Sequence, residues 1–331
     1  MKVLFIGGTG NISTSCTREA LSRGIEMSHL NRGMRNRVFG DEVETLQADI
    51  NKTEEVRGAI KGRDFDVVVD WIAYTPQDIE RDISLFSGHT RQYVFISSAS
   101  VYHKPPRHYI ITESSPTYNP FWVYSQKKIA SEERLRRAYS EQDFPMTIVR
   151  PSHTYSTGWM PNTWGSNDYT VPQRMLDGKN VIVHGDGQSL WTLTHTDDFA
   201  IALVGLLGNP DAIGETFQIT SDEAITWDQV HRIIGAALGV EPKIVHIPSE
   251  LLAKMAPEIG PGLIGDKAYS VVFDNSKIKR FVPGFVCKIP FHEGMRRSAQ
   301  WWRAHPKEAK IDPAIGATID RILAKWETIQ P

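Results

Sequence analysis

A glycine-rich segment directly after the first apolar run restricts the fold of this chain more than any other feature. Val3 to Ile6 are typical of a buried strand, Gly7 to Ser13 follow with glycines at positions 7, 8 and 10, and a helical pattern begins there. Glycine tolerates positive φ and, because it lacks a Cβ, lets the backbone approach a pyrophosphate. The next helix offers unpaired N–H groups and a positive dipole end to that anion. The position between a strand and a helix favours a dinucleotide-binding turn over the alternative, a tight turn without a ligand.

The first half of the chain alternates short apolar runs, which are typical of buried strands, with amphipathic stretches. The runs are Val3 to Ile6, Met27 to Leu30, Val43 to Leu46, Val67 to Val69, Tyr93 to Ile96 and Met146 to Val149. The amphipathic stretches include Ser13 to Arg23, Glu54 to Ile60, Ile79 to Phe86 and Ser125 to Tyr139. Successive parallel strands need crossover connections, so the alternation predicts an α/β fold with a doubly wound parallel sheet.

The composition changes after about residue 155. Tyr155 to Thr170 are rich in Gly, Pro, Asn, Ser and Trp, which predicts a long functional loop. Val181 to Val183 and a helix starting near Asp197 are expected to return to the first domain. We therefore expect residues 1–154 and about 180–220 to form a dinucleotide-binding domain. Residues from about 155–179 and 221–310 would form a smaller, mostly helical substrate-binding domain, and 311–331 a C-terminal helix.

Charge and cysteine content narrow the classes of function. Lys and Arg number 37 against 39 Asp and Glu, so the net charge is -2 and the basic surplus typical of nucleic-acid binding is missing. The two cysteines, Cys16 and Cys287, are far apart, which favours a reducing compartment and disfavours thiolate zinc. The longest apolar stretches, such as Ile201 to Leu207, are well short of the roughly 20 residues of a membrane span. We expect a cytoplasmic protein without a metal.

The residues after the second and third apolar runs bear on the choice of cofactor. Asn31 and Arg32 stand where dinucleotide folds often carry an acidic residue that would repel a 2′-phosphate. Arg32, with Arg35 and Arg37 nearby, could bind that phosphate, which favours NADP over NAD, although arginines in a loop are often only solvated. Asp49 is a candidate acceptor for the adenine amino group, and an N-cap of the following helix is an equal alternative.

Tyr124 and Lys128 are four residues apart in a helical pattern and so share one face of a helix. A free tyrosine has a pKa near 10, and a neighbouring ammonium favours the ionised form that could act as a base. Alone, this pair could be an ordinary surface pair. Phe95 to Tyr102, however, end an apolar run with a cluster of serines, at the sheet edge where α/β folds bind ligands.

With these motifs the sequence resembles the extended short-chain dehydrogenase/reductase family, often called the NAD-dependent epimerase/dehydratase family, which has a Rossmann-type sheet. The matching segments follow the family's order and are Gly7 to Ser13, Val69 to Tyr74, Phe95 to Tyr102, Tyr124 to Lys128, Val149 to Tyr155 and Gly185 to Asp198. Gly294 to Trp302 look like the family's closing helix.

The resemblance implies a role for each matching residue. Tyr124 would be the acid/base at a substrate hydroxyl, Lys128 would lower its pKa and bind the nicotinamide ribose, and Ser98 would hydrogen-bond the reacting oxygen. The cofactor would be NAD(P), bound by Gly7, Thr9, Gly10, Asn11, Ile12, Asn31, Arg32, Asp49, Ile50, Ala73, Lys128 and Pro151.

Four departures from the family pattern refine the expectation. Ser13 replaces the third glycine, which a capping serine can tolerate. Ala99 and Ser100 stand where dehydratases carry an Asp-Glu pair, which disfavours a 4,6-dehydratase. Trp191 replaces an arginine typical of nucleotide-sugar members, and His153 replaces a substrate-facing asparagine. We expect His153 and Trp191 to contact a smaller polyol, free sugar or glycoside, with Trp159 or Trp164 also stacking on it. Packing of the small domain is the alternative for these tryptophans.

The sequence therefore predicts an NAD(P)-dependent oxidoreductase or epimerase that acts on a secondary alcohol or ketone of a sugar-like substrate. We expect no nucleic-acid or membrane partner, and a homodimer is a candidate assembly. The alternative is a non-catalytic or RNA-associated protein on the same fold, since some members of the family bind RNA.

Overall fold

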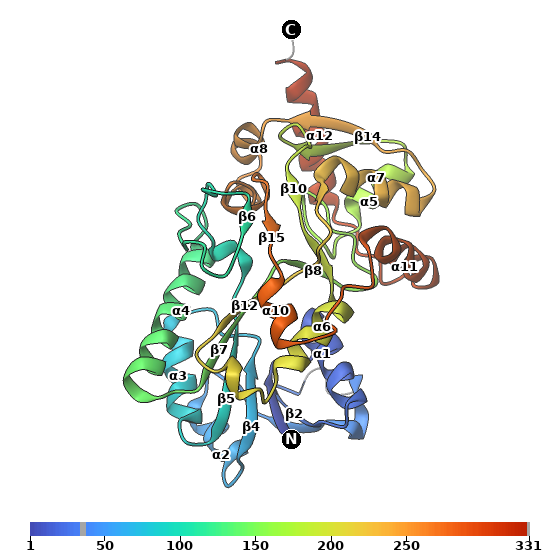
Figure 1. Ribbon diagram of the computed structural model, residues 1–331. Helices are drawn as coiled ribbons and strands as arrows, with labels where there is room; N and C mark the ends of the chain where they lie inside the picture. The colour runs from blue at the N-terminus through green and yellow to red at the C-terminus, as the bar shows by residue number, and fades with distance from the viewer. Residues whose placement is uncertain (34–37, 330–331) are drawn as a thin grey trace.

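The computed structural model describes residues 1–33 and 38–329, so the predicted phosphate ligands Arg35 and Arg37 lie outside the described residues. A seven-stranded sheet, with strand order β12-β7-β5-β4-β1-β2-β3, forms the half of the molecule that contains the N-terminus (Figure 1). Its strands are β1 (Lys2–Ile6), β2 (Glu26–Asn31), β3 (Glu44–Gln47), β4 (Phe65–Asp70), β5 (Thr90–Ile96), β7 (Met146–Pro151) and β12 (Thr216–Ile219). Every neighbouring pair is parallel, which confirms the predicted doubly wound sheet.

Successive side chains of the central strand β1 pack alternately against the helices on the two faces of the sheet. Val3 and Phe5 belong to a buried cluster with residues of α1 (Asn11–Ser22) and α6 (Thr196–Leu206). Leu4 and Ile6 belong to the opposite cluster, with residues of α2 (Thr53–Ile60), α3 (Pro76–Phe86) and α4 (Val123–Gln142). Successive side chains of a strand point to opposite faces, so a continuous apolar run is what a sheet covered on both sides requires.

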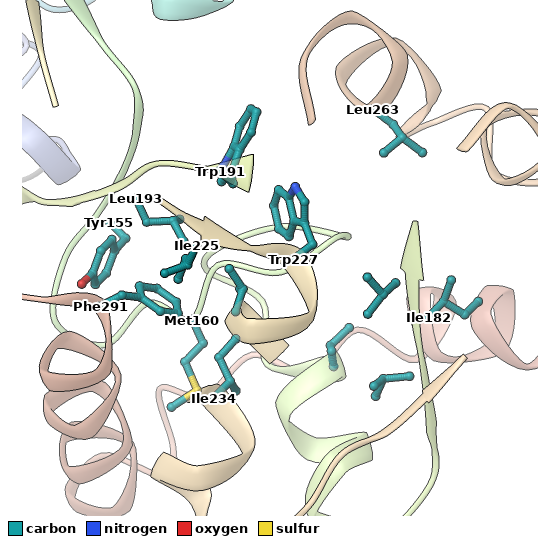
Figure 2. Packing of buried hydrophobic residues seen from close by; sticks show 14 of the residues in the cluster. Tyr155, Met160, Ile182, Trp191, Leu193, Ile225, Trp227, Ile234, Leu263 and Phe291 are labelled. Carbon is teal, nitrogen blue, oxygen red and sulfur yellow. The ribbon is translucent and has the colours of Figure 1, made fainter. Parts of the chain in front are cut away.

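The other half of the molecule has a separate buried cluster of its own (Figure 2). Its helices are α5 (Thr170–Leu176), α7 (Trp227–Leu238), α8 (Ser249–Met255), α9 (Gly260–Gly262), α11 (Phe291–Ala304) and α12 (Pro313–Glu327). Its short strands pair as β9 (Asn180–His184) with β14 (Lys243–Ile247) and β10 (Leu190–Trp191) with β13 (Ile225–Thr226). Two more pairs, β8 (His153–Tyr155) with β11 (Leu193–His195) and β6 (Ile110–Ile111) with β15 (Val272–Phe273), lie between the halves.

The structure corrects the sequence interpretation of two segments. Val181 to Val183 do not rejoin the seven-stranded sheet, because β9 pairs with β14 and its side chains are buried in the second cluster. Conversely, α10 (Ser276–Phe281) comes from the segment assigned to the substrate domain but packs beside α6 and β12 (Figure 1). The Phe217 and Phe281 rings, 4.8 Å apart, join it to the edge of the sheet.

None of the helices in the described part of the chain is both long and apolar enough to cross a membrane.

Candidate active site

The glycine-rich turn joins β1 to α1 and depends on the small size of its glycines. Gly7 has a φ of +84°, and a Cβ there would come within 2.7 Å of Ile72 Cγ2. A Cβ on Gly8 would meet the ring of His29, buried in the first half of the molecule, at 2.4 Å. Ser13 Oγ accepts a hydrogen bond from the Gly10 N–H (2.8 Å) and donates to the Gly7 carbonyl (3.0 Å). The serine therefore caps the turn, as expected from its position.

Two cavities meet at this turn. The first, of about 690 Å³, is lined by seven of the residues predicted to bind NAD(P), namely Gly7, Thr9, Gly10, Asn31, Arg32, Asp49 and Ile50. The second, of about 540 Å³, contains Gly7 and Gly10 as well as Asn11, Ile12, Ser98, Tyr124, Lys128, Pro151, His153 and Trp191. The structure thus brings nearly all the predicted site residues to one continuous hollow that spans the carboxyl ends of the sheet strands.

Ala73 is the exception, because it is fully buried and lines neither cavity. Its carbonyl accepts a hydrogen bond from Lys128 Nζ at 2.7 Å, so it contributes by positioning the lysine. Asp49 does not cap the following helix, which corrects one of its two interpretations. Its carboxylate accepts hydrogen bonds from the main-chain N–H and the side-chain amide of Asn51 (3.0 and 3.2 Å), whereas Lys52 occupies the N-cap position of α2.

Two buried polar atoms test whether this hollow fits a dinucleotide. Asn11 Oδ1 and Asn31 Nδ2 are buried and have no hydrogen-bond partner among the described residues. Buried polar groups are nearly always paired, so an unpaired acceptor and an unpaired donor indicate that a ligand supplies the partners. Asn11 lies in the second cavity and Asn31 in the first. A dinucleotide, which is polar along its length and crosses the turn, fits both positions.

The predicted catalytic residues lie together in the second cavity. Ser98 follows β5, and Tyr124 and Lys128 lie one turn apart on α4. Ser98 Oγ is 2.9 Å from Ser100 Oγ, which in turn accepts a hydrogen bond from Ser125 Oγ (2.8 Å). Lys128 Nζ donates to the carbonyls of Ala73 and Ile96, both at 2.7 Å. These contacts hold the serine and the lysine in fixed orientations beside the phenol.

Burial changes the pKa of both residues on α4. It raises the pKa of Tyr124 to about 12, although a hydrogen bond with Ser98 acts in the opposite direction. It lowers the pKa of Lys128 to about 8, which nearby Asp70 and Glu132 partly oppose. Lys128 Nζ lies 5.9 Å from the Tyr124 ring centre, and the effect of burial on the phenol prevails. Burial therefore sets the direction of the shift in this structure, and the lowering of the tyrosine pKa by Lys128 stays a prediction.

His153 and Trp191 line the same cavity and contact each other. Trp191 Nε1 donates a hydrogen bond to His153 Nδ1 (3.1 Å), and His153 Nε2 lies 2.7 Å from Ser166 Oγ. Burial lowers the pKa of His153 to about 3, so its ring is neutral. The Trp191 ring is 5.5 Å from that of Trp227 (Figure 2), so Trp191 both packs the second half and faces the cavity. Trp159 lines this cavity, whereas Trp164 lines a neighbouring one.

Several residues of this cavity were not predicted. They are Trp71, Tyr74, Trp122, Ser166, Asp266 and Lys267. The sequence did contain a signal for Trp122 as a cavity residue, because it stands two residues before Tyr124. Asp266 and Lys267 come from a distant segment without a recognisable pattern, so only the folded chain reveals them. In residues 1–33 and 38–329 no group of three or more His, Cys, Asp or Glu side chains is placed to hold a metal ion.

Comparison with known proteins finds a matching family model and several distant relatives. A model of the NAD dependent epimerase/dehydratase family matches residues 3–220. The chloroplast stem-loop binding protein of 41 kDa b from Arabidopsis thaliana is 23% identical over 259 residues, which are 74% of this chain and 65% of that protein. The UDP-N-acetyl-alpha-D-glucosaminuronate decarboxylase of Bacillus cytotoxicus is 25% identical over 182 residues, 55% of this chain and 53% of that protein. The chain thus spans about half to two thirds of the length of these relatives.

Solved structures match over almost their whole length. The dTDP-glucose 4,6-dehydratase of Bacillus anthracis, in complex with NAD, has a TM-score of 0.74 and 19% identity and covers 93% of this chain and 98% of its own. The UDP-glucose 4-epimerase of Bifidobacterium longum, in complex with NAD+ and UDP, has a TM-score of 0.74 and 18% identity, and covers 93% and 100%. At these identities the likeness establishes the fold.

Proposed function

This chain belongs to the NAD dependent epimerase/dehydratase family, and on that premise we propose that it is an NAD(P)-dependent oxidoreductase or epimerase. Its substrate would be a secondary alcohol or ketone of a sugar-like molecule. The observation that carries the proposal is that Ser98, Tyr124 and Lys128 line a cavity that ends at the glycine-rich turn. Fold alone does not define an activity, but an acid/base, a hydrogen-bond donor and a fixed cation beside a dinucleotide-shaped hollow do favour one.

Three residues of the cavity have different roles in the proposed reaction. Tyr124 is the group that gives a proton to, or takes one from, the reacting oxygen, and its raised pKa suits it first to the donor role. Ser98 Oγ is placed to donate a hydrogen bond as negative charge develops on that oxygen. Lys128 holds its position through two carbonyls and presents its charge to the ribose region. A bound dinucleotide would supply the acceptor and donor of hydride.

The cavity offers little support for elimination of water. Ala99 and Ser100 follow Ser98 in place of an acidic pair. Asp266 is the one carboxylate among the described residues that line this cavity, and it forms an ion pair with Lys104 at 3.3 Å. A dehydratase needs an acid and a base beyond the tyrosine, so we propose oxidation, reduction or epimerisation.

The two remaining outcomes differ in what happens to the hydride. In a net oxidation the reduced dinucleotide leaves with each turnover, whereas in an epimerisation it is used again on the same substrate. We propose to measure NAD(P)H absorbance while sugar stereochemistry is followed by NMR. Stoichiometric accumulation would identify a dehydrogenase, and inversion without accumulation an epimerase. If neither change occurred with any sugar, polyol or glycoside while NAD(P) was bound, the proposed activity would be refuted.

We propose that Arg32 gives the site a preference for NADP. Its side chain is exposed and lines the first cavity, where a 2′-phosphate could receive charge-assisted hydrogen bonds. We expect Arg32→Ala to weaken NADP binding by about 10- to 100-fold, the size of a hydrogen bond to a charged group, and NAD binding by less than about threefold. Calorimetry with both dinucleotides measures this, with exposed Arg91→Ala as the control. Equal losses for NAD and NADP would contradict the preference.

A second candidate function comes from one relative, whose name describes stem-loop binding. A protein that binds nucleic acid through its phosphates needs a basic surface, and this chain has a net charge of -2. It also keeps Tyr124 and Lys128 in one cavity. Binding of an RNA hairpin that weakens steeply with salt, together with no binding of either dinucleotide, would favour this candidate over the enzyme.

A further inference from the structure

Lys267 stands where two cavities of the candidate active site join. The cavity that contains Ser98 and Tyr124 and a neighbouring cavity of about 380 Å³ share three residues, Trp122, Tyr124 and Lys267. The neighbouring cavity adds aromatic and apolar surface from Phe121, Trp164 and Ile259. Lys267 therefore lines both cavities together with Tyr124, where a substrate that extends beyond the reacting carbon would reach it.

The main chain at Lys267 is held in place by the core of the second half. Its carbonyl accepts hydrogen bonds from His184 Nε2 (3.1 Å) and Trp227 Nε1 (3.2 Å), and both of these side chains are buried. The residue ends a π-helical turn, Leu263–Lys267, a rare conformation that is frequent at functional sites. The fold thus fixes the backbone of a residue that lines both cavities.

The ammonium of Lys267 has no carboxylate within ion-pair distance among the described residues; burial lowers its pKa, and the nearby Asp266 carboxylate partly opposes that effect. Across residues 1–33 and 38–329 it makes no hydrogen bond or ion pair. The adjacent carboxylate of Asp266 pairs with Lys104, a buried lysine. His153 is neutral, and Glu258, which lines the neighbouring cavity, is exposed. A cation in a partly enclosed site without a partner attracts an anion strongly, because little solvent is present to screen it.

We propose that Lys267 binds an anionic group of the substrate, so that the substrate class is an acidic sugar or a sugar phosphate and not a neutral polyol. This inference rests on the proposed function, whose substrate it specifies. None of the described residues lining the two cavities is an arginine, so the forked donor suited to a diphosphate is missing. One lysine suits a single carboxylate or phosphate monoester.

The test compares ligands that differ only in charge. Glucose and galactose are each compared with the corresponding uronate and 6-phosphate by quenching of tryptophan fluorescence, with and without NAD. We expect at least one anionic form to bind about 10-fold more tightly than its neutral counterpart, which corresponds to about 1.4 kcal/mol. A preference for the uronate identifies a carboxylate ligand and a preference for the 6-phosphate a phosphoryl ligand. High salt should weaken binding of the anion and leave the neutral sugar unaffected.

Variants assign that preference to one residue. In Lys267→Met the preference should fall to within about twofold, and in Lys267→Arg it should return, whereas exposed Lys325→Met on α12 should keep it. Equal binding of charged and neutral sugars by the wild type, or a preference that survives Lys267→Met, would overturn the inference. Binding is read without turnover, so that result would leave the proposed chemistry of Tyr124 standing. Failure to bind NAD(P) would refute the proposed function independently.

Discussion

Replacing Tyr124 by phenylalanine should reduce kcat by on the order of 10³-fold, with dinucleotide binding and folding preserved. The substitution removes the one proton that the phenol can give or take and leaves the ring in place. Positioned acid/base groups contribute about 10² to 10⁴ in rate, so the expected loss lies within this range. The Tyr124 ring also packs against Trp122, with ring centres 4.9 Å apart, and phenylalanine preserves that contact.

Tyr139→Phe is the matched control for this prediction. Tyr139 lies on the same helix, α4. Its side chain is exposed and its ring lies close to Gly214. It should retain full activity. Steady-state rates, calorimetric dinucleotide binding and thermal unfolding of both variants complete the comparison. A Tyr124→Phe enzyme that kept more than about a tenth of its activity would exclude the phenol as the proton donor.

Glu132→Gln should lower the free energy of unfolding by about 3 to 5 kcal/mol, the usual result of breaking a buried ion pair from one side. The Glu132 carboxylate accepts from Arg150 Nε (2.9 Å) and Nη2 (2.5 Å) and from Ser97 Oγ (2.6 Å). It joins helix α4, which contains Tyr124 and Lys128, to β7 and to the residue before Ser98. The variant leaves the buried Arg150 guanidinium without a counter-charge, so its loss of stability should be accompanied by reduced activity.

The contribution of Glu132 to stability should decrease as the pH is lowered. Burial alone would raise the pKa of Glu132, but hydrogen bonds from Arg150 and Ser97 hold it below its ordinary value of 4.5. A group whose pKa is lower in the folded state stabilises the fold above its unfolded pKa, and that contribution is lost as the pH falls through the folded pKa. The difference between wild type and Glu132→Gln should therefore be complete at neutral pH and shrink below about pH 4.5.

Denaturant unfolding at several pH values measures both predictions. Glu133→Gln is the control, because its neighbouring carboxylate is exposed and its loss should change stability by less than about 0.5 kcal/mol. A Glu132→Gln variant as stable as Glu133→Gln at pH 7 would show that the buried network does not hold the catalytic elements together.

Local patterns in the sequence predicted the parts of the fold that depend on neighbouring residues. The apolar runs became strands because a sheet covered on both faces needs continuous apolar segments, and Gly7 to Ser13 became the turn that their small side chains permit. Thr216–Ile219 was not predicted as a strand, since its alternating pattern resembles many other segments. It becomes β12 because β7 is available to pair with it and α10 covers it.

The candidate site likewise contains some residues that local patterns predict and others that they do not. Tyr124 and Lys128 are linked by helical spacing and Ser98 by its position after a strand, so sequence placed them correctly in one cavity. The partner of β9 could not be predicted, because Lys243–Ile247 lies some 60 residues further along the chain. Lys267 lies in the cavity because of long-range packing of the same kind. The pKa of Tyr124 also depends on burial, which spacing does not reveal.

Calorimetric titration of the intact chain with NAD and NADP measures whether the hollow at the glycine-rich turn binds a dinucleotide, with Gly8→Val as the comparison. A side chain at Gly8 would collide with the His29 ring, at 2.4 Å from its Cβ, and distort the turn. We expect the wild type to bind one dinucleotide per chain and Gly8→Val to lose at least about 100-fold in affinity. Absence of binding of either dinucleotide by the folded wild-type protein would contradict this expectation.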